Sequence, residues 1–240
     1  MDFDLLFHEA WPAYEQRVHE GWVLRHAGGV TKRANSVLAL HRPADLGGAI
    51  ETAEAFYGER GQRCVFSMGA KAAPGLDEEL ERRGYEVVDP TVVMVASCGQ
   101  IGDGAGPVRV EERPWPGWME TWWAVDGRYG SGYGEAERIC TGVPAWYGAV
   151  EEDGVALAVG RAVPQGDTLG IFCMATRPEA RRRGLARTVL RALVRHAGVG
   201  SAYLCTTAAN QAAQALYRSE GFEVVSRYHY RVRRPALDDV

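Results

Sequence analysis

Hydrophobic and polar positions follow one another along the chain in patterns that predict both strands and helices. Thr168–Thr176 is a run of strand-forming residues, and the segment that follows, up to about His196, has a helical pattern. Residues 146–151 and 155–163 predict a hairpin, because the short segment between them ends in Gly154 and is typical of a tight turn. Strands and helices in this order predict an α+β fold, in which helices pack on a mixed sheet.

The order helix, strand, helix, strand occurs twice along the chain. It runs from residue 45 to residue 96 in the first half and from residue 181 to residue 233 in the second. Gly84 in the first half and Gly221 in the second stand where a helix ends and the last strand begins. A repeated order of this kind indicates that a domain has been duplicated. The elements expected in the first half are a helix over 45–61, a strand over 63–68, a helix over 76–83 and a strand over 85–96.

Glycine and proline are dense where the two halves join, which is typical of a linker. We therefore expect one domain over residues 1–98, a linker over residues 99–107 and a second domain over residues 108–240. The second domain is expected to open with a strand over 108–112 and a tryptophan-rich helix over 115–125.

The loop between the predicted strand and helix of the second half has the chemistry of an anion site. Gly184 has no Cβ, so a ligand can approach its backbone closely, and the first amides of the helix add positive potential. Three arginines before it supply planar donors suited to phosphate oxygens. No Gly-Lys-Ser/Thr follows, as in a nucleotide P-loop, and the spaced glycines of a dinucleotide site are absent from the sequence here. The alternative interpretation is a solvated basic start of a helix.

Two motifs in this half resemble the signatures of the GNAT N-acetyltransferases. Arg181-x-x-Gly184-x-Ala186 resembles the pyrophosphate loop of that family, and the segment from Asn210 to Phe222 resembles its second signature, N-x-x-A-x-x-L-Y-x-x-x-G-F. The resemblance is strong over about residues 168–222 and weak over the first hundred residues. It implies two GNAT-like domains, each a mostly antiparallel mixed sheet flanked by helices.

The first of these domains departs from the family pattern. It has no Arg-x-x-Gly-x-Gly segment before its helix at residue 45, and its second helix has no asparagine and tyrosine at the matching positions. We therefore expect a tandem GNAT protein whose degenerate N-terminal half has lost coenzyme binding.

The resemblance implies an acyltransferase that moves the acetyl group of acetyl-CoA directly to a primary amine, on a small molecule or a protein terminus. Tyr217 would be the general acid that protonates the departing thiolate, and Asn210 would contact the pantetheine arm. The other expected coenzyme-binding residues are Met174, Ala175 and Thr176 at the pantetheine arm, and Arg181, Arg182, Arg183, Gly184, Leu185 and Ala186 at the pyrophosphate. Each single role has a structural alternative: Tyr217 can be a core aromatic, and Asn210 can be the N-cap of its helix.

The general base and the acceptor site stay open at this point. An amine must lose a proton before it attacks, and a carboxylate or histidine would accept that proton. Surface carboxylates are common, so none of the candidates is assigned as catalytic: Glu111, Glu112, Glu135, Glu151 and His229. The polar segment 30–37 is either a turn or a donor of Arg33 or Asn35 to the acceptor pocket. The glycine-rich segment 126–135 is either a binding loop or a connector.

Composition narrows the classes of partner. The net charge is -4, which argues against a nucleic-acid binder. The five cysteines include no Cys-x-x-Cys pair, so neither a disulfide framework nor a metal site is expected, and Cys173 and Cys205 are read as small buried hydrophobes. Neither a signal-peptide pattern at the first residues nor a run as long as the ~20 apolar residues of a membrane span occurs, so a cytoplasmic protein with no membrane partner is expected.

Two other function classes compete with the enzyme. A coenzyme A-binding regulatory module would keep the phosphate loop without turnover, and a structural interaction domain would bind no coenzyme at all. The intact loop together with Tyr217 favours the enzyme. We expect the protein to be a monomer or a homodimer.

Overall fold

The computed structural model describes residues 1–103, 106–126 and 132–233, and it divides into two compact units. The first unit comprises Met1–Thr91 and the residues from Ser226 on, and the second is Val92–Val225. The fold is α+β, as expected, with helices packed on mixed sheets.

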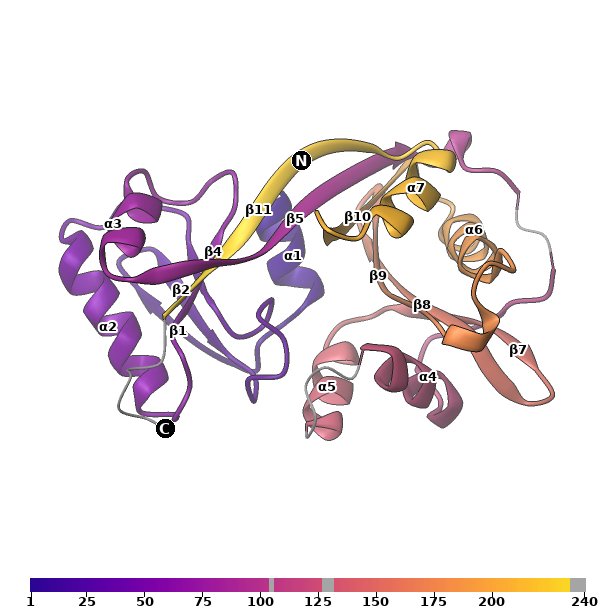
Figure 1. Cartoon of the computed structure of the whole chain (residues 1–240), viewed down its shortest axis with the longest axis horizontal. Helices are drawn as coiled ribbons and strands as arrows, with labels where there is room; N and C mark the ends of the chain where they lie inside the picture. Colours follow the sequence, from indigo (N-terminus) through magenta and orange to yellow (C-terminus); the bar gives the residue numbers. More distant parts are fainter. Residues whose placement is uncertain (104–105, 127–131, 234–240) are drawn as a thin grey trace. The chain divides into compact units, whose positions relative to one another are not determined.

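The first unit begins with three antiparallel strands, and its sheet also includes the last strand of the chain (Figure 1). Its strands lie in the order β1-β2-β3-β4-β11-β5, where β3 and β4 are parallel and β4 and β11 are antiparallel. Its core includes Trp22, Phe66 and Tyr85, whose rings meet edge to face. The elements are α1 (Phe3–Ala10), β1 (Glu15–His19), β2 (Trp22–His26), β3 (Val37–Ala39), α2 (Leu46–Gly58), β4 (Val65–Met68), α3 (Leu76–Arg82), β5 (Tyr85–Ser97) and β11 (Glu223–Arg233).

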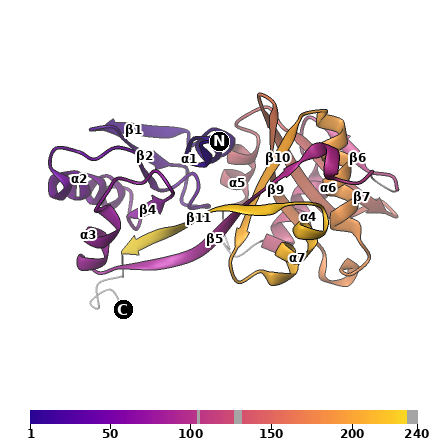
Figure 2. The ribbon, with the colours of Figure 1, turned by 90° about the horizontal axis from the view of Figure 1, so that it is seen from above.

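The second unit has strands in the order β5-β10-β9-β8-β7-β6 (Figure 2). β6 to β9 are antiparallel to one another, and β9 and β10 are parallel. Its remaining elements are η1 (Cys98–Gln100), β6 (Arg109–Glu111), α4 (Pro116–Asp126), α5 (Tyr133–Cys140), β7 (Trp146–Glu152), β8 (Val155–Gln165), β9 (Thr168–Thr176), η2 (Pro178–Ala180), α6 (Leu185–Ala197), β10 (Ser201–Thr207) and α7 (Gln211–Ser219).

Helices cover both faces of this second sheet (Figure 1). On one face, a Cβ built at Gly148 would lie 3.2 Å from the side chain of Leu193, so α6 packs directly on the backbone of β7. On the other face, Trp118 of α4 meets Tyr147 of β7 edge to face, with ring centroids 5.1 Å apart. Both α6 and α4 also contact β9, so this strand lies between the two helices.

The compact units do not coincide with the predicted domains. The end of β5 from Val92 to Ser97 belongs to the second unit, whereas β11 from Ser226 on belongs to the first. The reason is that His229–Val232 pairs with Val65–Met68 of β4, and Tyr228 packs on Phe7 of α1 with ring centroids 5.5 Å apart. The predicted boundaries at residues 98 and 108 were based on the glycine and proline content of the segment between them. That content does not indicate which strand pairs with which.

The repeated order of elements is confirmed, as α2-β4-α3-β5 in the first half and α6-β10-α7-β11 in the second. In both halves a parallel pair of strands flanks the first helix, β3 with β4 and β9 with β10. Helix α5 was not predicted, because Tyr133 to Glu135 were read as the end of a glycine-rich loop. Residues 127–131 of that loop, and residues 104–105 of the predicted linker, lie outside the described residues.

Candidate active site

The predicted pantetheine-binding residues lie where two parallel strands stop pairing. β9 pairs with β10 from Thr168 opposite Ser201 to Ile171 opposite Leu204. Both strands continue, β9 to Thr176 and β10 to Thr207, but across the described residues their ladder ends there. Backbone groups on this edge of β9 are thereby open to an extended ligand, which could add to the strand as a further strand would. Met174, Ala175 and Thr176 form the end of this open segment.

A β-bulge shapes the same end of β9. The register with β8 shifts between Val159 and Arg161, so that Cys173 and Met174 together lie opposite Gly160. Cys173 takes a positive φ of 53°, and a Cβ at Gly160 would come within 2.5 Å of the Met174 sulfur. Bulges bend the strand that carries the extra residue. The bend gives a physical reason for the end of the β9–β10 ladder.

The loop after β9 presents backbone amides at the start of α6. Arg182 and Gly184 have φ values of 65° and 79°, and left-handed residues among ordinary ones turn successive N–H groups toward one concavity. No side chain caps α6, so within the described part of the chain its first amides lack an internal acceptor. A Cβ at Gly184 would meet nothing within 4 Å, so there is open space beside the loop. This geometry fits a phosphate group.

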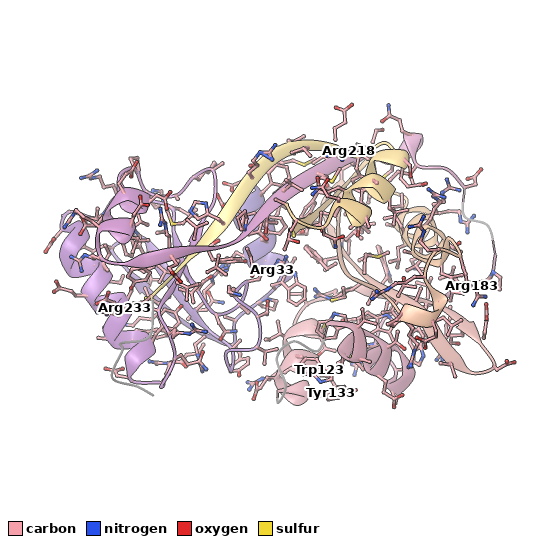
Figure 3. All side chains as sticks on the ribbon, viewed as in Figure 1. Arg33, Trp123, Tyr133, Arg183, Arg218 and Arg233 are labelled. Carbon is pink, nitrogen blue, oxygen red and sulfur yellow. The ribbon has the colours of Figure 1, made fainter. Side chains whose placement is uncertain are left out.

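The three arginines of the loop are exposed and have different side-chain positions. Arg181 donates from Nε to the carbonyl of Thr176 at 3.3 Å, which ties the loop back to the end of β9. Arg183 pairs with Glu152 at the end of β7 (Figure 3). Both members of that pair are about half exposed, so the pair contributes little stability. Leu185 and Ala186 begin α6 and are half-buried.

Asn210 is the N-cap of α7. Its side-chain oxygen accepts a hydrogen bond from the backbone N–H of Ala213 at 3.1 Å. The capping alternative is therefore confirmed, and the contact with a pantetheine arm stays a prediction.

Tyr217 is buried in α7, with its ring centroid 6.0 Å from that of Phe222. Burial, with a smaller effect of the Cys205 thiol, raises the pKa of Tyr217 well above its ordinary value. Cys205 belongs to the part of β10 beyond the end of the ladder, so the phenol lies beside the open segment. Core packing is thus observed for Tyr217, and its catalytic role stays a prediction.

The candidates for the general base lie on several elements, and three of them have contacts elsewhere. Glu111 accepts from Arg109 at 3.2 Å, and Glu151 accepts from the indole of Trp115 at 2.8 Å. His229 lies in the first unit, 3.1 Å from Asp77. Glu112 lines a cavity of about 970 Å³ beside α5, and Glu135 is in the first turn of that helix.

Segment 30–37 forms a turn braced by Asn35. The side chain of Asn35 accepts from the amides of Ala27 and Gly29 and donates to the carbonyls of Ala27 and Thr31. The turn alternative is therefore confirmed. The Arg33 guanidinium lies 5.7 Å from the ring centroid of Trp11, also in the first unit (Figure 3).

Near the bulge, Arg161 and Cys140 were not assigned a role from the sequence, and Cys173 was read only as a core residue. Arg161 of β8 is completely buried, and the sulfurs of Cys140 and Cys173 lie 3.7 Å apart. Cys173 and Cys205 are half-buried, which corrects the expectation that both are buried hydrophobes. The sequence signal that could have indicated this group of residues is the arginine at position 161, inside the otherwise apolar run 155–163.

The described ranges hold neither a metal-binding cluster nor a helix that could cross a membrane. No cluster of three or more histidine, cysteine, aspartate or glutamate side chains is arranged to hold a metal ion there. No described helix combines the length and apolar character that crossing a membrane requires.

Comparison with known proteins identifies the family. The family model described as "Probable histone acetyltransferase Rv0428c C-terminal" matches residues 7–232. The chain belongs to this family of GNAT N-acetyltransferases. The "Uncharacterized N-acetyltransferase YobR" of Bacillus subtilis is 29% identical over 236 residues, which cover 94% of this chain and 95% of that protein. As a GNAT protein, the chain is an acyltransferase.

Solved structures share the GNAT fold over nearly the whole chain. A GCN5-related N-acetyltransferase from Kribbella flavida has a TM-score of 0.68 at 18% identity, covering 93% of this chain and 91% of that one. A tandem GNAT protein from the clavulanic acid biosynthesis pathway has a TM-score of 0.60 at 12% identity, covering 98% and 89%. At these identities the likeness concerns the fold alone. The family implies acetyl-CoA as co-substrate and an amine-bearing acceptor.

Proposed function

We propose that the second unit binds acetyl-CoA at the open end of β9 and transfers the acetyl group to a primary amine. The observation that carries this proposal is the continuity of two features. The segment of β9 that β10 leaves unpaired ends at Thr176, and eight residues later Gly184 begins an uncapped helix N-terminus. One feature suits an extended amide-containing arm and the other suits phosphates.

Different residues of the second unit would hold the pantetheine arm and the pyrophosphate of the coenzyme. Backbone groups of Met174, Ala175 and Thr176 would hydrogen-bond the pantetheine arm along the open edge. The amides from Arg182 to Ala186 would hold the pyrophosphate, with room at Gly184 for close approach. The side-chain oxygen of Asn210 caps α7, so its amide nitrogen is the group that would donate to a carbonyl of the arm.

Tyr217 would act on the leaving group. Acetyl-CoA supplies an acetyl thioester, whose reaction with an amine releases a thiolate. A phenol whose pKa is raised by burial keeps its proton at neutral pH, so Tyr217 can donate that proton as negative charge develops on the sulfur.

The first unit would be a repeat without coenzyme. Its α2 stands in the place of α6, but the residue before α2 is Asp45, whose carboxylate lies over the first turn: a Cβ at Gly48 would be 2.7 Å from its Oδ2. A carboxylate at this position would repel a phosphate that approached the first amides of α2.

The alternative is a coenzyme A-binding regulatory module without turnover, which the core packing of Tyr217 on Phe222 would also allow. Release of free thiol from acetyl-CoA, measured against a diamine, an amino acid, an aminoglycoside and a peptide with a free N-terminus, separates the two. Acceptor-dependent release supports the enzyme. Binding of acetyl-CoA without release above the buffer rate for any acceptor class supports the module.

A further inference from the structure

Two thiols meet where α5 packs against the bulge of β9. Cys140 is the last residue of α5, and Cys173 is the bulged residue with positive φ. Their sulfurs are 3.7 Å apart, and a disulfide needs a separation of about 2.05 Å. The sulfurs must therefore approach each other by only about 1.7 Å to form the bond.

A buried cation lies beside this pair. Arg161 is completely buried on β8, directly opposite Tyr147 of β7 and Phe172 of β9. The Tyr147 hydroxyl donates to the carbonyl of Cys140 at 2.7 Å, which holds the end of α5 against the sheet. The two sulfurs, the arginine and the tyrosine thus form one cluster within the second unit, which we call the Cys140–Cys173 cluster.

The charges around the cluster favour a thiolate. Burial alone raises the pKa of Cys140, but the hydrogen bond with Cys173 and the charge of Arg161 outweigh burial and hold that pKa below its ordinary value. Glu137, one turn earlier on α5, acts in the opposite direction but less strongly. Thiolates are the nucleophiles of thiol–disulfide exchange, and a nearby arginine promotes them.

We propose that Cys140 and Cys173 are a redox-active pair, which a small disulfide of the oxidised glutathione class converts reversibly into an intramolecular disulfide. Cys173 is half-buried and Cys140 is buried, so Cys173 is the sulfur that an external reagent reaches first. The bond would link α5 covalently to the bulge of β9.

The exchange takes two steps and balances. In the first, the Cys173 sulfur loses its proton and attacks one sulfur of the reagent, whose S–S bond breaks. A mixed disulfide forms, and a small thiolate leaves and is protonated. In the second, the Cys140 thiolate attacks the Cys173 sulfur of the mixed disulfide, and the second small thiolate leaves and is protonated. Two electrons pass from the protein to the reagent, which is reduced to two thiols.

The test is to equilibrate the whole protein in glutathione buffers of increasing oxidised fraction, then quench, alkylate and map the peptides by mass spectrometry. Trypsin cleaves after Arg161, so the two cysteines fall in separate peptides. The expected result is a linked pair of these peptides that dithiothreitol separates, while Cys64, Cys98 and Cys205 stay alkylated. Independent alkylation of both cysteines at every ratio would overturn the proposal, as would linkage of either to another cysteine as often as to its partner.

Variants locate the chemistry. Cys173→Ser should abolish the linked peptide, whereas Cys98→Ser, on the 3-10 helix η1, should leave it unchanged. Arg161→Met should slow alkylation of the pair at neutral pH by roughly tenfold for each unit that the thiol pKa rises, while Arg161→Lys keeps most of the rate. An unchanged rate in Arg161→Met would remove the arginine from the account. The wild-type peptide map decides the proposal without any variant.

Discussion

Arg191 donates a hydrogen bond from Nε to Oε2 of Glu220 at 2.7 Å and so ties α6 to the residue that follows α7. The Glu220 side chain is 1% exposed, and Arg187 of α6 approaches its other oxygen at 2.6 Å. One of these helices starts at the anion loop and the other carries Tyr217. The buried carboxylate therefore fixes the spacing between the two parts of the proposed site.

Glu220→Ala should lower the free energy of unfolding by about 2 kcal/mol, because it removes a buried acceptor from two arginines that remain partly hydrated. Urea denaturation followed by tryptophan fluorescence measures the change. Glu223→Ala, at an exposed position at the start of β11, is the matched control and should cost less than about 0.5 kcal/mol. Equal effects of the two substitutions would show that the interaction of Glu220 with the two arginines does not stabilise the fold.

Asn35→Ala should also destabilise the protein, by about 2 kcal/mol or more, because it leaves buried backbone groups of the 27–35 turn without their partners. Thiol release per folded molecule should stay within about twofold of wild type if Asn35 serves only this turn. A large selective rise in the KM for the acceptor, with unfolding unchanged, would instead assign Asn35 to acceptor binding.

Alkaline pH should weaken the fold through its buried tyrosines. Burial raises the pKa of Tyr57, Tyr85, Tyr147 and Tyr217, in Tyr147 to about 12. The unfolded chain releases these protons near pH 10, so the stabilising effect is complete below that pH and is lost as pH rises through the folded pKa. For Tyr147 alone the loss approaches about 1.4 kcal/mol per pH unit between about pH 10 and pH 12. Urea unfolding at several pH values should give a shallower fall for Tyr147→Phe than for the exposed Tyr14→Phe.

Tyr217→Phe should lower kcat by about a hundredfold and leave the affinity for acetyl-CoA within about twofold, because only the proton donor is lost. Thiol-release assays measure kcat, and calorimetric titration measures the affinity for acetyl-CoA. Tyr85→Phe, a buried tyrosine of the first unit bonded to Glu54, is the control and should not change turnover. Full activity in Tyr217→Phe would leave Tyr217 as a core aromatic and nothing more.

The sequence predicts local structure well where the hydrophobic pattern agrees with the positions of the turn-forming residues. The bounds of β9 match the run Thr168–Thr176, and the β7–β8 turn falls at Asp153 and Gly154, both of which have positive φ. Gly84 and Gly221 have positive φ before β5 and β11, as is common just after a helix ends. These features depend on neighbouring residues, which is why sequence alone reveals them.

Features that depend on distant residues could not be predicted in this way. The pairing of β11 with β4 joins residues about 160 positions apart, and no local pattern selects β4 over another strand. The loop motif was evident from Gly184, but no local pattern predicts the positive φ of Arg182 or the end of the β9–β10 ladder at Ile171, just before the bulge. The Cys140–Cys173 cluster arises from the packing of α5. This helix was not predicted, because the glycines around its start at Tyr133 are typical of a loop.

Calorimetric titration of the protein with acetyl-CoA, alongside Gly184→Asp and Gly166→Asp, tests the central claim most directly. Both glycines have positive φ and open space at Cβ, so the two substitutions impose similar backbone strain. Only the first places a carboxylate at the start of α6. The account predicts one site per chain in the wild type and in Gly166→Asp, and loss of binding in Gly184→Asp. Binding that survives Gly184→Asp, or a stoichiometry of two per chain, would contradict it.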